Sequence, residues 1–323
     1  MSVVSPLGYG IHQIELVPID DTYATTGYLI LGKEQNAIVE TGASASNAAI
    51  LAGLRELNVS TEEIHAIVVT HVHLDHAGGA GTLAEQCPNA TVYVHERGMP
   101  HLADPEKLIA ASRAVYGKSF DRLFHSVKPI PKKRIRALRD GDQLDLGERR
   151  LLRFIDTPGH ALHHISIVDE ESGGIFSGDA AGMYYPELNR KFGIQVALPA
   201  TTPTQFDPAD TLSTLNKMSD LKPRRLYYTH IGMGEPAIPL LDEVKSWLEL
   251  YGEKCVEIYR KNPSLKLLTN FLHEAVAKRL EKRGAVGDCE SLRNMEIHNE
   301  LNALGLVAYD NRMERRKKKA KNG

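Results

Sequence analysis

Short runs of apolar and β-branched residues alternate with turn residues along the first two thirds of the chain. Runs of this kind are typical of β-strands. They predict strands at residues 11–18, 24–32, 35–40, 64–70, 91–94, 150–155, 164–169, 174–177 and 224–228. Apolar residues at helical spacing predict helices between the strands, at about residues 47–57, 81–86 and 99–127. The pattern is that of a protein in which sheets and helices are mixed.

The apolar positions change to helical spacing from Pro239 onward. Leu240, Val244 and Trp247, for example, share one face of a long helix. The pattern predicts helices at residues 238–260, 265–282 and 289–304, the last ended by Gly305, and then a short strand at 306–309. A basic run follows and predicts disorder. We therefore expect a domain at residues 1–238, a C-terminal helical extension at 239–310 and a basic, disordered tail at 311–323.

The composition is that of an ordinary soluble globular chain. Its 323 residues are 42% hydrophobic and 25% charged, with a formal net charge of −2. This balance gives no argument for binding to nucleic acid or to a membrane. No apolar run approaches the ~18 residues of a membrane-spanning helix. The first residues lack a basic segment followed by an apolar one, so no signal peptide is expected.

Three cysteines, Cys87, Cys255 and Cys289, lie far apart and are odd in number. They suit reduced thiols better than a disulfide framework, so we expect a cytoplasmic location. Because the chain has no Cys-x-x-Cys pair, any bound metal is expected to be held by histidine and aspartate.

The densest group of chemically active residues follows the strand predicted at 64–70. His71, His73, Asp75 and His76 lie within six positions and are followed by a pair of glycines. An extended backbone points His71 and His73 the same way, because they are two positions apart. Imidazole and carboxylate are good ligands for zinc, iron or manganese. The spacing predicts a metal-binding loop rather than a solvated, histidine-rich loop.

Three further strand ends carry histidine or aspartate. The strand at 150–155 leads into Thr157-Pro158-Gly159-His160. The strands at 164–169 and 174–177 are predicted to form a hairpin around residues 170–173 that ends at Gly178-Asp179, and the last strand ends at Thr229-His230. Strand-to-loop junctions are where rigid scaffolds commonly present functional side chains. His160, Asp179 and His230 are therefore candidate functional residues.

With these motifs together, the chain resembles the metallo-β-lactamase-fold hydrolases, in the branch that holds glyoxalase II and the lactonases. The resemblance covers roughly residues 10–235, and the motifs occur in the family's order. It implies an α+β fold, a four-layer αββα sandwich with two metal ions at one edge of the paired sheets, so that residues 1–238 form the catalytic domain.

The resemblance also implies a role for each motif residue. It assigns His71, His73 and His160 to the first metal, Asp75, His76 and His230 to the second, and Asp179 to a bridge between both. The implied cofactors are two divalent metal ions, with zinc as the first choice and iron or manganese as alternatives.

The chain departs from the family's pattern in two places. The family usually has an aspartate before Thr-Gly in an early strand, where it supports the metal loop, and here the sequence is Glu40-Thr41-Gly42. His163 and His164, after His160, are unusual for glyoxalase II. We expect His164 to pack or hydrogen-bond behind the ligands, and the alternative is a direct ligand.

Four residues are candidates for catalysis. Asp75 and Asp179 are expected to orient the nucleophile and to handle its proton. Tyr184 and Tyr185 follow the Gly-Asp motif, and similar lactone-cleaving relatives place a tyrosine near there. Either tyrosine is a candidate carbonyl stabiliser or acid, and the alternative is an aromatic side chain that packs under the pocket.

Three classes of function are compatible with these motifs. The first is a binuclear metallohydrolase that cleaves a small ester, thioester or lactone with a metal-bridged hydroxide. The second is a non-haem di-iron protein that binds oxygen or transfers electrons on the same fold. The third is a nucleic-acid-associated metallohydrolase, because residues 296–309 faintly resemble the end of a winged-helix domain next to the basic tail. We favour the first, with a small-molecule substrate and no membrane or nucleic-acid partner, and a homodimer through the C-terminal helices is a further hypothesis.

Overall fold

The computed structural model describes residues 2–16, 25–124, 126–201, 204–287 and 289–322. The ends of two predicted strands, at residues 17–18 and 24, lie outside this range. The chain divides into two compact units. The first comprises Met1–Thr157, His163–Gly178 and Arg225–Met233, and the second comprises Pro158–Leu162, Asp179–Arg224 and Gly234–Gly323. This division differs from the boundary after residue 238, which stays a prediction about domains.

The first unit contains a seven-stranded sheet whose strands follow one another in chain order. They are β1 (Val4–Gly8), β2 (Ile11–Glu15), β3 (Thr26–Leu31), β4 (Asn36–Val39), β5 (Ile64–Val68), β6 (Thr91–His95) and β7 (Ile135–Leu138). The first three pairings are antiparallel, and β4 to β7 are parallel. The parallel strands need crossover connections, which the helices supply.

A second sheet of six strands has the order β15-β14-β11-β10-β9-β8. Its strands are β8 (Gln143–Asp145), β9 (Leu151–Asp156), β10 (Ile165–Asp169), β11 (Gly174–Gly178), β14 (Arg225–Tyr228) and β15 (Gly232–Gly234). The hairpin predicted around residues 170–173 is confirmed, since β10 and β11 pair antiparallel. Because β11 and β14 run parallel, their carboxyl ends lie at the same edge of this sheet.

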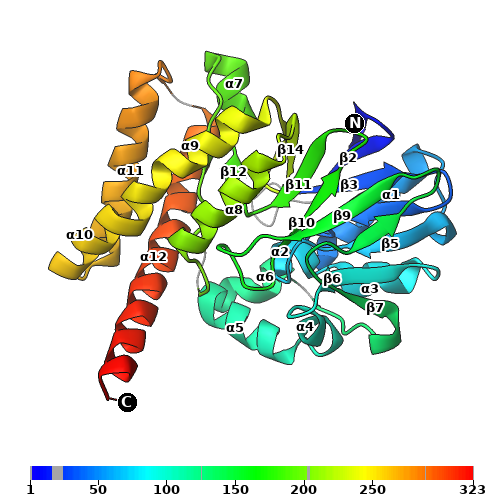
Figure 1. The fold of residues 1–323 in the computed structure, drawn as a ribbon, viewed down its shortest axis with the longest axis horizontal. Helices are drawn as coiled ribbons and strands as arrows, with labels where there is room; N and C mark the ends of the chain where they lie inside the picture. The colour runs from blue at the N-terminus through cyan, green and yellow to red at the C-terminus, as the bar shows by residue number, and fades with distance from the viewer. Residues whose placement is uncertain (1, 17–24, 125, 202–203, 288, 323) are drawn as a thin grey trace. The chain divides into compact units, whose positions relative to one another are not determined.

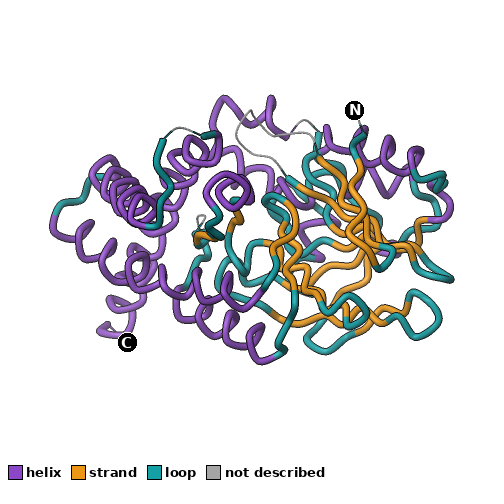
Figure 2. Tube along the Cα trace, turned by 90° about the horizontal axis from the view of Figure 1, so that it is seen from above, coloured by secondary structure: helices purple, strands orange, loops and turns teal. Residues whose placement is uncertain are grey.

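Two apolar cores form because side chains alternate along each strand. Tyr28, Ile30 and Val39 of the first sheet share one core with Phe154 and Phe176 of the second. The alternate residues of the first sheet form another core with helices α1 (Asn47–Glu56) and α3 (Ala80–Gln86). Figure 2 shows the strands of this unit gathered together with helices beside them. The first unit is therefore layered as helix, sheet and sheet.

Residues 99–124 are largely helical, as predicted, and residue 125 of the predicted segment 99–127 lies outside the described residues. They form α4 (Met99–Ala103), α5 (Glu106–Tyr116) and α6 (Phe120–Phe124). Phe120, Leu123 and Phe124 of α6 pack with Leu74, which directly follows His73 in the chain. This segment therefore contacts the loop that carries the histidine motif.

The second unit is mainly helical (Figure 1). It contains α7 (Pro186–Phe192), α8 (Pro208–Asp220), α9 (Ala237–Glu249), α10 (Cys255–Lys261), α11 (Leu265–Lys282) and α12 (Glu290–Asn322), with a short pair of strands, β12 (Met183–Tyr184) and β13 (Ala197–Leu198). A π-helical segment, Leu250–Lys254, joins α9 to α10. Across the ranges that the structure describes, no helix has both the length and the apolar character needed to cross a membrane.

Helix α12 differs from the sequence prediction. It continues through Gly305, so the strand predicted at 306–309 is wrong, and with it the likeness to a winged-helix end. A glycine inside a helix costs only about 1 kcal/mol relative to alanine, and its neighbours Ala303 and Leu306 are buried. Residues 311–322 are helical rather than disordered. Cationic side chains in a last turn interact favourably with the helix dipole, which supports this end.

Candidate metal centre

The motif loop follows β5 and turns directly into a short helix. His73 has an extended backbone and is the N-cap of α2 (Leu74–Ala77). Asp75 and His76 lie inside α2, and the His76 backbone N–H donates to the His73 carbonyl at 3.1 Å. His73 therefore lies on extended chain directly before the helical turn that carries the next two motif residues.

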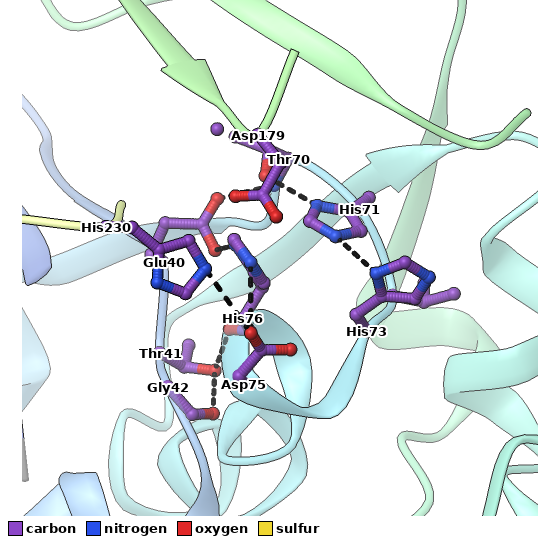
Figure 3. A network of polar contacts seen from close by, with 12 residues as sticks. Glu40, Thr41, Gly42, Thr70, His71, His73, Asp75, His76, Asp179 and His230 are labelled. Carbon is purple, nitrogen blue, oxygen red and sulfur yellow. Dashed lines mark hydrogen bonds and ion pairs between the residues drawn. The ribbon is translucent and has the colours of Figure 1, made fainter. Parts of the chain in front are cut away.

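His71 and His73 direct ring nitrogens at one another. Nε2 of His71 lies 2.9 Å from Nδ1 of His73 (Figure 3), and His71 is fully buried. Two nitrogens bound to one zinc ion, each at about 2.0–2.1 Å, lie about 3.3–3.4 Å apart in a tetrahedral site. The two ring nitrogens therefore converge as two ligands of one metal ion would, but they lie slightly closer together than ligands of a bound ion.

Asp75, His76 and His230 form a second group in the same unit. Oδ2 of Asp75 lies 3.5 Å from Nε2 of His76 and 3.4 Å from Nε2 of His230. The three ligand atoms lie within 4.8 Å of one another, and both histidines are buried. A carboxylate and two imidazoles converging at this spacing fit a divalent metal ion.

Glu40 supports the loop despite the substitution for aspartate. It is fully buried, and its Oε1 accepts the Thr70 backbone N–H at 2.9 Å while Oε2 lies 3.0 Å from Nδ1 of His76 (Figure 3). Thr41 adds two bonds to the His76 carbonyl, from its backbone N–H at 2.9 Å and its hydroxyl at 2.8 Å. The glutamate has a left-handed backbone with φ of 66°. The segment at 40–41 thus holds both the strand end and the helical turn.

His164 lies behind the motif histidines, as predicted. Its Nδ1 is 2.8 Å from the Thr157 hydroxyl, and its ring stacks on that of His71 with centroids 4.9 Å apart. His163 places Nδ1 3.5 Å from the Val72 backbone nitrogen. Both histidines therefore contact the loop, and His164 has the hydrogen-bonding and packing role expected of it.

The second unit brings His160 and Asp179 together. Nε2 of His160 lies 3.5 Å from Oδ2 of Asp179, and both residues are buried. The His160 Nδ1–H donates to the Ala200 carbonyl at 2.9 Å, which leaves the Nε2 lone pair available to a metal. Their assignment to one centre with the residues of the first unit stays a prediction.

The two tyrosines also belong to the second unit and are buried. The Tyr185 hydroxyl lies 2.6 Å from Nδ1 of His298 on α12. Burial raises the pKa of Tyr184 and holds the pKa of Tyr185 well above its usual value. Both hydroxyls thus keep their protons at neutral pH, as a hydrogen-bond donor requires, and their catalytic roles stay predictions.

Sequence reasoning missed the contribution of Thr41 and Thr70. Thr70 places its hydroxyl 3.1 Å from Nδ1 of His71, and Thr41 holds the carbonyl of His76. Their one signal in the sequence is position, because each is a polar residue two positions after the end of a buried strand.

Comparisons with known proteins give one family and several relatives. The family model described as the metallo-beta-lactamase superfamily matches residues 21–230. The metallo-beta-lactamase fold-containing protein ST1585 of Sulfurisphaera tokodaii is 28% identical over 232 residues, which are 71% of this chain and 81% of the relative. Its solved structure aligns with a TM-score of 0.65 at 22% identity and covers 93% of this chain and 99% of that one. The predicted α+β sandwich with C-terminal helices is confirmed.

Several relatives carry names of enzymes. The hydroxyacylglutathione hydrolase of Bradyrhizobium sp. (strain ORS 278) is 28% identical over 141 residues, 43% of this chain and 43% of the relative. The human acyl-coenzyme A thioesterase MBLAC2 is 27% identical over 191 residues, 54% of this chain and 64% of the relative. The chain therefore spans less than two thirds of the length of each of these enzymes.

Proposed function

The chain belongs to the metallo-β-lactamase superfamily, and from this membership we propose that it is a binuclear metal-dependent hydrolase of a small thioester, ester or lactone. Relatives named as a hydroxyacylglutathione hydrolase and an acyl-coenzyme A thioesterase support hydrolysis and make thioesters the first class to test. The bond that is cleaved and the substrate are parts of the proposal.

One observation carries the proposal, namely the group formed by Asp75, His76 and His230. Its ligand atoms converge within 4.8 Å, and Glu40 orients His76 from behind. Residues that orient a metal-binding histidine through its other nitrogen are a regular feature of metal sites. Three protein ligands leave coordination positions open, as catalytic sites require.

The full ligand set is proposed from the order of the sequence motifs. His71, His73 and His160 would hold one metal ion, Asp75, His76 and His230 would hold the other, and Asp179 would be a ligand shared by both. Zinc is proposed first, and iron or manganese suit the same donors. When bound, two such ions supply a Lewis acid and bring the pKa of water near neutrality.

The remaining roles fall to side chains of this chain. Asp75 and Asp179 are proposed to orient the attacking water and to accept its proton, because carboxylates are suited to general base work. Tyr184 is proposed to donate a hydrogen bond to the substrate carbonyl or to the leaving group. We prefer it to Tyr185, whose hydroxyl is bonded to His298. A thiolate leaves without an acid, so a thioester depends least on this tyrosine.

The test combines metal analysis with hydrolysis assays on one preparation of the full chain. We expect close to two metal ions per chain and hydrolysis of an activated thioester or ester. His73→Ala abolishes the activity, whereas His273→Ala, in a surface pair with Glu296 at 3.3 Å, keeps it. Full activity in a metal-stripped sample contradicts the proposal. Coloured, iron-containing protein without hydrolysis supports the di-iron alternative.

A further inference from the structure

The motif histidines of the first unit have different partners behind them. Nδ1 of His76 faces a carboxylate oxygen of Glu40 at 3.0 Å. Nδ1 of His71 faces the hydroxyl of Thr70 at 3.1 Å. The nitrogens that would bind metal are thus supported by groups of different chemistry.

This difference sets the tautomer of one ring and leaves that of the other open. A carboxylate accepts hydrogen bonds, so Nδ1 of His76 carries the proton and Nε2 carries the lone pair. A hydroxyl both donates and accepts, so Thr70 is compatible with either tautomer of His71. His76 is therefore fixed in the form that binds a metal through Nε2, whereas the Thr70 hydroxyl does not by itself fix the tautomer of His71.

The distances between the ligand atoms also differ between the His71–His73 pair and the group of Asp75, His76 and His230. Nε2 of His71 and Nδ1 of His73 are 2.9 Å apart, at the usual length of a hydrogen bond. Oδ2 of Asp75 lies 3.5 and 3.4 Å from the ring nitrogens of His76 and His230, beyond the usual range of about 2.7–3.2 Å. The first pair thus lies at hydrogen-bonding distance, while the second group has the wider spacing of ligands around a bound cation.

Glu40 is itself held rigidly. It is fully buried, its backbone N–H donates to the Val68 carbonyl at 2.9 Å, and its Oε1 accepts the Thr70 N–H at 2.9 Å. The side chain therefore reaches His76 with its second oxygen while the first is anchored. Glu40 therefore fixes the orientation and tautomer of the His76 ring before a metal ion binds.

We infer that Glu40 is a positioning residue that makes Asp75, His76 and His230 the first metal site to be filled. The first metal equivalent binds this group, and the second binds more weakly at the group that contains His71 and His73. At limiting metal the protein then holds one ion per chain. This inference rests on the two-metal centre of the proposed function.

The first test uses wild-type protein that has been stripped of metal. Long-range ¹H–¹⁵N spectra of the imidazoles are recorded while zinc is added, with calorimetry in parallel. We expect the Nδ1–H tautomer at His76 before zinc is added. The first equivalent then shifts the signals of His76 and His230, and the second shifts those of His71 and His73. The opposite order, simultaneous shifts, or an Nε2–H tautomer at His76 overturns the inference.

The second test uses Glu40→Gln, which keeps the shape of the side chain. An amide has one oxygen and one NH₂, so it cannot accept from both the Thr70 N–H and the His76 Nδ1–H. We expect the affinity of the first step to fall by on the order of 10–100-fold. Glu40→Asp, which keeps the carboxylate, restores part of it. The matched control is Thr70→Val, which removes only the hydroxyl next to His71 and leaves the first step unchanged.

Equal effects of Glu40→Gln and Thr70→Val on both steps overturn the inference, and if Glu40→Gln does not fold, the wild-type spectra decide. Binding is measured without substrate, so the two proposals fail separately. Stepwise loading without hydrolysis contradicts the function alone. Hydrolysis by a protein that loads both ions together contradicts the positioning role alone.

Discussion

The imidazole of His164 stacks on that of His71, with ring centroids 4.9 Å apart and ring planes at 29°. Nδ1 of His164 is held at 2.8 Å from the Thr157 hydroxyl, which also lies 2.9 Å from the hydroxyl of Ser166. His71 therefore packs against a buried ring that directly precedes β10 of the second sheet. The position of a proposed ligand depends on the packing of both sheets.

Replacing His164 by leucine tests this support. His164→Leu removes the stacked ring and leaves the Thr157 hydroxyl with one partner fewer, which costs about 1–3 kcal/mol when the group is buried. We expect a lower free energy of unfolding and a lower metal content at limiting zinc. Thr157→Val removes the same hydrogen bond but keeps the ring, so it loses stability with less effect on metal. Wild-type metal content in His164→Leu contradicts the support.

Gly178 is required where the second sheet approaches the motif loop. Its φ is +51°, and a Cβ there would lie 2.5 Å from Nε2 of His164 and 2.6 Å from the Thr70 hydroxyl. Gly193 also has a positive φ, +69°, but no atom lies within 4 Å of its added Cβ. Gly193→Ala should cost about 1–2 kcal/mol of backbone strain, and Gly178→Ala an additional ~1–3 kcal/mol from overpacking. Urea unfolding of both variants measures the difference, and equal values contradict it.

The motif loop could be predicted from the sequence because its geometry is local. His71 and His73 are only two positions apart, so their relative placement depends mainly on the few residues of the loop itself. The bond from Glu40 to His76 spans 36 positions. It depends on the register that pairs Val39 with Val68 and on the left-handed backbone of Glu40. The sequence shows only that a glutamate replaces the usual aspartate.

In helix α12, a local sequence signal predicts the wrong end of the helix. Gly305 is a local signal for the end of a helix, yet the helix continues to Asn322. Asp310 is 6% exposed and pairs with Arg260 of α10 at 2.6 Å, 50 positions away. Contacts of this kind stabilise the helix beyond the glycine, and local propensity does not contain them.

Removing the metal should lower the stability of the fold as well as abolish activity. A ligand that binds only the folded state stabilises it, by about 2.7 kcal/mol at a free concentration 100 times its Kd. We expect a lower Tm in chelator than in zinc, with full recovery when zinc is returned. Magnesium at the same concentration is the control, because it prefers oxygen ligands. An equal Tm in chelator and in zinc contradicts the presence of a metal site in the folded chain.

The basic end of α12 should contribute less to the free energy of unfolding than the turn before it, which contains Arg312. Residues 315–321 are exposed, whereas the Arg312 guanidinium donates to the Thr204 and Phe206 carbonyls. Arg312→Ala should therefore destabilise the chain by about 1–3 kcal/mol, while truncation after residue 314 changes the free energy of unfolding by less than ~0.5 kcal/mol. Circular dichroism checks the helical end, since the truncated chain should lose helical signal. An unchanged helical signal indicates that this end is disordered in solution.

The two tyrosines should separate into a structural and a catalytic role. Tyr185→Phe leaves Nδ1 of His298, which lies 2.6 Å from the hydroxyl, without that partner in a buried place. We expect a loss of about 1–3 kcal/mol of stability and an unchanged kcat for folded protein.

Tyr184→Phe should leave the free energy of unfolding unchanged and lower kcat. The fall in kcat should be larger for an alkyl ester than for a thioester. An alkoxide leaving group needs a proton, whereas a thiolate leaves without one. General acid catalysis typically contributes about 10²–10⁴-fold, so the effect on the ester is large enough to measure. Because burial raises the pKa of Tyr184, its hydroxyl stays protonated at pH values where a free tyrosine begins to ionise. The ester activity of the wild type should therefore not fall at pH 9–10 through loss of this proton. Equal effects of Tyr184→Phe on ester and thioester would show that Tyr184 does not act on the leaving group.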